Sequence, residues 1–277
     1  MPRMHGKPAS FSSITNTKVD HPMNPRILPA TLILSLVSSG ALAQSGQLFG
    51  VPARFNIGPE AYRQNIKIGK GDQILQQDAT LYGVSGGLRL QFSEAQGAEF
   101  SARMAKGEAD SQLKSQQRVL VRGGKHNATD YELRGVYQYT MALAGKPLTA
   151  SAGMGYLQQN KQLDKGSMAA EYYYATTGVA TRLALGEQWS VAPRLNYQRL
   201  LSGKQHLNGG IKEDVRQKAG YGVELAADFN LKLADKALNL TPFYRYWNVN
   251  AASRNGKPSP FPASNTNEAG LKASLEF

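Results

Sequence analysis

Two histidines are the residues of this chain best suited to proton transfer. His126 precedes Asp130, and His206 precedes Glu213 and Asp214. A histidine beside a carboxylate can act as a general acid or base. Neither histidine stands in an Asp-x-His or His-x-Ser pattern, and no glycine-rich loop leads into a helix as phosphate binding would require. We therefore predict no catalytic residues and no enzymatic activity.

Metal and thiol chemistry are excluded on composition. The chain has no cysteine, so it can form neither a disulfide nor a thiolate metal site. It has four histidines, of which His5 and His21 lie near the N-terminus. The two remaining histidines are too few for a histidine-rich centre. We predict no metal and no cofactor.

Charged residues recur at every second position of several segments. In 130–143, Asp130, Glu132 and Arg134 alternate with Tyr131 and Leu133. A period of two places the charges on one face of a strand and the apolar residues on the other. The predicted inward-facing charges are Arg89, Arg103, Arg134, Arg182, Arg194, Arg245, Glu99, Glu132, Glu224, Asp228 and Glu268, joined by Lys272 and Glu276.

The alternation places these residues on strands, and the connections between successive strands are alternately short and long. The alternating segments are 79–92, 98–107, 130–143, 148–160, 171–185, 188–202, 217–231, 238–251 and 267–277, with a weaker one in 54–68 that Gly58 and Pro59 interrupt. Short joints fall at 93–97, 144–147, 186–187 and 232–237, and long loops at 108–129, 161–170, 203–216 and 252–266. This layout predicts an all-β fold, a transmembrane antiparallel up-and-down β-barrel of ten strands, with eight as the alternative count.

Outward-facing aromatic residues fall at two heights on these strands. Tyr131 and Tyr139, like Trp189 and Tyr197, stand eight residues apart. Eight residues of a tilted strand rise roughly 21 Å, close to the ~25 Å apolar band of a membrane barrel. A soluble barrel or sandwich with these aromatics in its core is the alternative. The predicted membrane girdles comprise Tyr82, Tyr131, Tyr197, Tyr221 and Tyr246 at one level and Phe92, Trp189, Phe229 and Phe277 at the other.

Both ends of the chain carry export signals. Met23 to Arg26 is a short basic start, an apolar run follows, and Ala41-Leu42-Ala43 is a small-x-small cleavage site. We therefore expect 1–22 to be an over-long start or extension, 23–43 a secretory signal peptide and 44–277 the barrel domain. The last segment alternates up to Phe277, so its edge must be covered, as closure of a barrel would do.

The terminal phenylalanine resembles the C-terminal signal of Gram-negative outer-membrane β-barrels, through which such proteins meet the barrel-assembly machinery. The chain also resembles a poorly characterised group of proteobacterial outer-membrane barrels of the porin-like or opacity type. The resembling stretches are 55–60, 82–83, 131–135, 242–248 and 265–271. The resemblance implies an integral outer-membrane barrel of the cell envelope, and it transfers no ligand residue.

The charged interior leaves three functions open. Buried charges must pair or stay hydrated, so a closed structural network is the first expectation, in a non-enzymatic barrel with a role in envelope structure or surface interaction. A narrow diffusion pore with a charged lumen is the second. Since some ten-strand barrels are proteases and some smaller barrels are lipid-A deacylases, a hydrolase at the outer rim is the third.

The basic balance of the chain, a net charge of +12, points to lipid rather than to nucleic acid, which an outer-membrane location excludes. Lys114, Arg118, Arg122 and Lys125 stand in an acid-free stretch from Ser111 to Thr129. We expect them to contact the phosphates of outer-membrane lipid and lipopolysaccharide. Ordinary solubility of an exposed loop is the alternative.

The two export signals generate the first prediction. N-terminal sequencing of the protein from an outer-membrane fraction should find Gln44 as the first residue. Deletion of Phe277 should reduce the amount of folded barrel in that fraction, because the last strand then lacks its terminal aromatic residue. Retention of residues 1–22, or a soluble periplasmic pool of native protein, would contradict this expectation.

Overall fold

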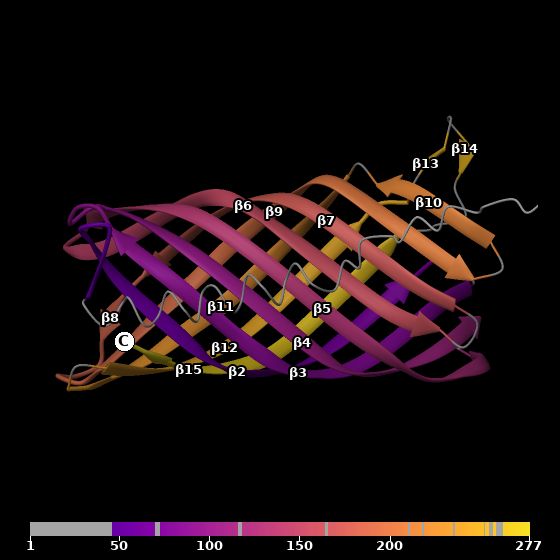
Figure 1. The fold of residues 1–277 in the computed structure, drawn as a ribbon, viewed down its shortest axis with the longest axis horizontal. Helices are drawn as coiled ribbons and strands as arrows, with labels where there is room; N and C mark the ends of the chain where they lie inside the picture. Colours follow the sequence, from indigo (N-terminus) through magenta and orange to yellow (C-terminus); the bar gives the residue numbers. More distant parts are fainter. Residues whose placement is uncertain are drawn as a thin grey trace, which may run out of the picture.

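The protein folds as one closed antiparallel barrel of ten strands (Figure 1). The computed structural model describes residues 46–277 apart from 70–72, 116–117, 164–165, 210, 218, 235, 252, 255–256 and 259–262. The barrel strands are β2 (Val51–Ile68), β3 (Gln73–Gln91), β4 (Gln96–Ser115), β5 (Arg118–Leu143), β6 (Lys146–Leu163), β7 (Gly166–Thr181), β9 (Trp189–Gly209), β11 (Gly220–Leu233), β12 (Lys236–Val249) and β15 (Ser264–Glu276). The predicted all-β barrel is confirmed with ten strands, and the count of eight is wrong.

Short additional strands extend the ends of the barrel. β1 (Gln47–Leu48) pairs with β2, whereas β8 (Leu183–Ala184) and β10 (Ile211–Gln217) both pair with β9. β13 (Ser253–Arg254) and β14 (Lys257–Pro258) form a separate small hairpin. The described residues contain no helix long and apolar enough to cross a membrane.

The last strand closes the barrel, as its alternation to the final residue predicts. β15 pairs with β12 on one side and with β2 on the other. Beyond β15, the amide of Phe277 donates to the carbonyl of Phe55 at 2.8 Å, and the amide of Phe55 donates back at 3.2 Å. Both edges of the terminal strand are therefore hydrogen-bonded, which leaves no free edge for aggregation.

The predicted interruption of the first strand is wrong, because β2 runs unbroken through Gly58 and Pro59. Both residues pair with β3, whereas the paired positions between β2 and β15 skip them. Proline has no amide hydrogen to donate to a ladder. A Cβ atom at Gly58 would lie 1.8 Å from the carbonyl oxygen of Ala273, so only glycine allows this close approach. The pairing of β2 with β15, which closes the barrel and which we call the closing seam, is therefore interrupted at these two residues.

As predicted, the connections are short at one end of the barrel and long at the other. Three of the four segments predicted as long loops are, however, largely strand. At one end the joints are short, as at Ala144-Gly145, where both φ angles are positive in a two-residue hairpin turn. At the other end β4, β5, β6, β7 and β9 continue into the segments 108–129, 161–170 and 203–216. Beyond the apolar band neither face of a strand must be apolar, so these extensions carry no hydropathy alternation.

The outward face between the two ends is a band of large apolar side chains. Tyr82 is 64% exposed and Trp189 is 50% exposed. A closed barrel with such a surface faces lipid, because exposing an apolar surface of this extent to water is unfavourable. Seven of the predicted girdle residues are exposed, and Tyr131 and Tyr246 are half-buried on the outward face. Their contact with the membrane interfaces stays a prediction.

The short turns lie at the end where the C-terminus lies, and the small hairpin of β13 and β14 lies at the opposite end (Figure 1). In outer-membrane barrels short turns face the periplasm. A cysteine replacing the exposed Gln162, near the long end of β6, should therefore react with a membrane-impermeant maleimide on intact cells. A cysteine replacing Ala144 should react only after lysis, and the reverse pattern would invert the barrel.

Candidate functional site

Apolar and aromatic side chains fill the lumen towards the long-stranded end. Tyr174 of β7 and Trp247 of β12 stack edge to face with ring centroids 5.3 Å apart, in one cluster with Leu157 of β6. Glycine makes room for them, since a Cβ atom at Gly155 would lie 2.2 Å from the ring of Tyr174. Glycines in these strands thus admit large side chains into a narrow barrel.

Next to this apolar layer, six charged side chains meet at the centre of the lumen. We call them the central cluster: Arg103, Glu132, Arg134, Glu224, Arg245 and Glu268. Arg245 contacts Glu224 at 2.5 Å and Glu132 at 2.8 Å, and its distance to Glu268 is 3.6 Å. Arg103 contacts Glu132 at 2.7 Å and Glu268 at 3.0 Å, while Arg134 contacts Glu224 at 3.3 Å. Three positive and three negative groups leave the cluster neutral.

The central cluster spans the full width of the barrel. Arg245 lies on β12 and Glu132 on β5, which are five strands apart in either direction around the sheet. The side chain of Arg245 is 1% exposed and that of Glu268 is fully buried. Side chains from opposite walls therefore touch at the axis, and the lumen is closed at this height.

Neutral side chains complete the hydrogen bonding of the central cluster. The hydroxyl of Tyr174 donates to Glu132, and the amide of Asn196 donates to Glu224 at 3.1 Å. The amide of Gln64 donates to Glu268 at 3.0 Å. Burying an ion pair costs several kcal/mol per ion unless its remaining polar atoms are satisfied. These neutral donors serve the three carboxylates, whereas Nη1 of Arg103 has no hydrogen-bond partner among the described residues and its guanidinium lies 5.0 Å from the ring centroid of Tyr62. The ion pairs and the neutral donors join the six residues into one network.

A second polar network lies beside the central cluster and was not predicted. The buried carboxylate of Asp130 accepts hydrogen bonds from Tyr62 at 3.0 Å, Gln64 at 2.7 Å and Gln159 at 3.4 Å. The ammonium of Lys161, 3% exposed, donates to Gln77 at 2.9 Å. Lys161 lies in a segment predicted as a loop, and the only signal for its inward position is its phase with Leu157 along β6.

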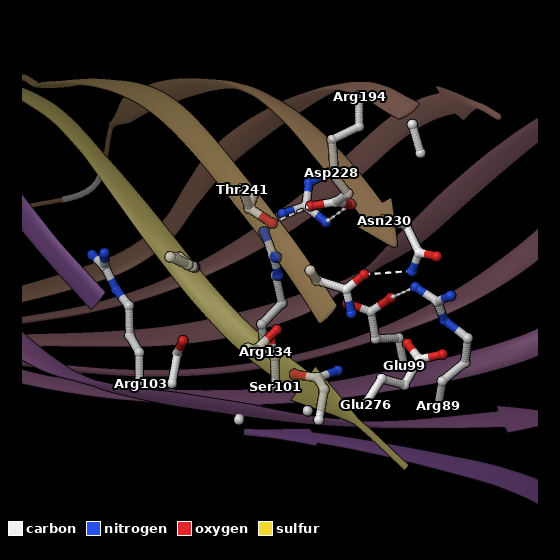
Figure 2. Close-up of a pocket in the computed structure, with 18 of the residues that line it drawn as sticks. Arg89, Glu99, Ser101, Arg103, Arg134, Arg194, Asp228, Asn230, Thr241 and Glu276 are labelled. Carbon is white, nitrogen blue, oxygen red and sulfur yellow. Dashed lines mark hydrogen bonds and ion pairs between the residues drawn. The ribbon is translucent and has the colours of Figure 1, made fainter. Parts of the chain in front are cut away.

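The lumen opens into a polar cavity on the short-turn side of the central cluster (Figure 2). This cavity has a volume of about 110 Å³ and shares lining residues with a wider vestibule of about 870 Å³ at the barrel mouth. Two ion pairs stand in its wall, Arg89 with Glu99 at 3.1 Å and Arg194 with Asp228 at 3.2 Å. Arg182 lines both spaces.

Ten of the eleven residues predicted for the lumen network are therefore brought into ion pairs with one another. Arg182 is the exception, since it reaches the lumen but has no carboxylate within ion-pairing distance among the described residues. Two carboxylates join from β2 and β15: Glu60 lies 3.9 Å from Lys272, and Glu276 pairs with Arg54 at 3.3 Å. Glu60 was missed because its segment reads as an interrupted strand.

The residues expected to contact lipid phosphate lie on the hairpin of β4 and β5, in strands rather than in a loop. Lys114 donates to Gln76 at 2.7 Å, and the exposed Lys125 pairs with Glu108 at 3.2 Å. Arg118 and Arg122 lie at the start of β5. Their contact with phosphate stays a prediction.

The two histidines lie on separate walls. His126 of β5 stands opposite Ala109 of β4, and His206 of β9 stands opposite Asp214 of β10. β6 and β7 separate β5 from β9 in the sheet. Within the described parts of the chain, no three histidine, aspartate or glutamate side chains gather as a metal site would need.

Solved structures share this architecture. The outer membrane protease OmpT from Escherichia coli matches with a TM-score of 0.54 at 8% identity, over 81% of this chain and 95% of that one. The translocator domain of the autotransporter NalP from Neisseria meningitidis has a TM-score of 0.42 at 10% identity, over 90% and 99% of the two chains. OprG from Pseudomonas aeruginosa has a TM-score of 0.38 at 10% identity, over 81% and 96%. No protein-family model and no curated protein sequence matches the chain.

The central cluster generates a stability prediction. Replacing Arg245 by alanine leaves buried carboxylates without their partner, which costs about 3–5 kcal/mol of unfolding free energy. Replacing Arg54 by alanine removes an exposed pair, worth less than about 1 kcal/mol. Urea unfolding of the refolded protein in detergent micelles, followed by tryptophan fluorescence, measures both. Equal effects of the two changes would show that the central cluster is hydrated.

Proposed function

We propose that the chain is a non-enzymatic integral barrel of the outer membrane, with a role in envelope structure or surface interaction. Its closed β-barrel fold, its lipid-facing apolar band and its polar lumen support this proposal. On this proposal the lumen is a structural core rather than a path for solutes. The observation that carries it is the contact of Arg245 with Glu132 across the barrel axis at 2.8 Å.

Two layers support the closed lumen. The aromatic layer of Tyr174 and Trp247 fills the side towards the long strands, and the central cluster fills the middle. A diffusion pore needs a continuous hydrated path. The cavities of about 110 and 870 Å³ lie on the short-turn side of the central cluster, whereas a cavity beside Trp247 on the long-stranded side has a volume of only about 20 Å³.

The narrow pore remains the alternative, and the cavity beside the central cluster is the observation in its favour. Arg134 and Arg194 stand at the boundary between that cavity and the central cluster, with side chains 12% and 19% exposed. Movement of these two side chains would be the smallest rearrangement that opens a hydrated path past the central cluster. The rim hydrolase is favoured only by the register that places His206 of β9 opposite Asp214 of β10. OmpT, at 8% identity, shares the fold of this chain and no more.

Exposed basic residues on the extended hairpins support a surface role. Lys125 at the long end of the barrel is 71% exposed in its side chain, and Lys204 on β9 is also exposed. Cations at this height would meet the phosphate groups of lipopolysaccharide. Lipid and lipopolysaccharide are therefore the partners proposed for the outer surface, and the barrel-assembly machinery is the partner proposed for β15.

Ion conductance tests the proposal directly. The refolded protein should show no steady conductance in a planar bilayer, because the central cluster blocks the axis. Arg134→Ala should produce or raise conductance by opening the boundary of the cavity. Lys125→Ala, which removes an exposed cation outside the lumen, should change nothing.

A wild-type protein that already conducts would contradict the closed lumen. In that case Arg134→Ala should leave the unfolding midpoint nearly unchanged and shift an existing conductance towards cations. This combined result would favour the diffusion pore over the structural core as the function of the lumen.

A further inference from the structure

The blind cavity on the short-turn side is rich in guanidinium groups. We propose that it is a binding site for a phosphate group, entered from the periplasmic mouth of the barrel. Six arginines line it, against four carboxylates. Figure 2 shows Arg89, Arg134 and Arg194 projecting from its different walls. The proposal goes beyond a structural lumen, because it assigns this space a ligand.

Charge matching singles out Arg182. Arg89 has Glu99, Arg194 has Asp228, and the three arginines of the central cluster have its three glutamates. Among the described residues Arg182 is the one arginine of this cavity without a carboxylate within ion-pairing distance. The cavity therefore holds an unmatched positive charge at its mouth, which an anion would neutralise.

Unused donors lie deeper in the wall. The Nε–H groups of Arg89 and Arg194 are buried and have no hydrogen-bond partner among the described residues. A buried donor without a partner costs free energy, more so when it is charged. The two groups belong to β3 and β9, and Arg182 follows β7. Because β7 pairs with β9 and β3 lies opposite β9 in the barrel, these cations stand on two opposite walls of the cavity. Cations on opposite walls suit a tetrahedral oxyanion, whereas a planar carboxylate is best held by one guanidinium fork.

Hydroxyl groups and size agree with this ligand. Ser85 and Ser190 line the same space and can each donate a hydrogen bond. The cavity volume of about 110 Å³ accommodates a phosphate group, and the vestibule of about 870 Å³ leaves room for an organic substituent. The cavity carboxylates Glu99, Asp228 and Glu276 each form an ion pair with another arginine, and none lies within ion-pairing distance of Arg182.

Calorimetric titration of the refolded protein, in micelles of a phosphate-free detergent, tests this site. Inorganic phosphate should bind saturably to the wild type. Arg182→Gln should weaken that binding by about 10- to 100-fold, the change expected for one lost charge-assisted hydrogen bond. Its unfolding midpoint should stay unchanged, because Arg182 has no ion pair to lose. The matched control is Lys204→Gln, an exposed cation at the other end of the barrel, which should bind phosphate as the wild type does.

Three further results decide the assignment. Absence of saturable binding to the wild type, or equal binding by Arg182→Gln, would overturn the site. Acetate binding as tightly as phosphate would overturn the choice of ligand. If phosphatidylglycerol added to the micelles abolishes the titration, the phosphate comes from a lipid headgroup, and if it does not, from a soluble compound. Conductance of the wild type would contradict the closed lumen while leaving phosphate binding intact, so the two proposals fail separately.

Discussion

The barrel depends on the mutual neutralisation of three arginines and three glutamates at the centre of its lumen. A ten-strand barrel is too narrow to hydrate every inward charge, and too wide to be filled by small apolar residues alone. Arg245 resolves this constraint by contacting Glu132 and Glu224 at once, with Glu268 at 3.6 Å. The aromatic layer lies on the long-stranded side of this charged centre, the second polar network lies beside it, and the cavity lies on its short-turn side.

The sequence predicts the ten strands because one face of each strand must be apolar. That requirement makes every second residue informative, as at Tyr221, Val223 and Leu225 of β11. The requirement for an apolar outward face ends where the strands extend beyond the apolar band. The sequence therefore predicts loops at Lys161 and at the ends of β4 and β5, although their backbones continue in the sheet.

The inward phase of the charges is equally predictable, but their partners are not. Alternation shows that Glu132 and Arg245 face the axis without giving their heights, which depend on the stagger of all ten strands. The contact between them follows from the register of neighbours such as Arg245 with Glu268. Glu60 illustrates a second limit. Gly58 and Pro59 obscure the alternation of β2, although the closing seam tolerates both residues.

The pairing across the lumen also has a consequence for the order of folding. Glu132 and Arg245 are 113 residues apart in the chain, and Arg103 and Glu268 are 165 apart. The ion pairs therefore join segments from the first half of the barrel, β4 and β5, to its last two strands, β12 and β15. Before β12 and β15 are in place, Arg103 and Glu132 lack two of the partners that bury them. We expect the loss of water from the lumen to accompany closure of the seam between β15 and β2.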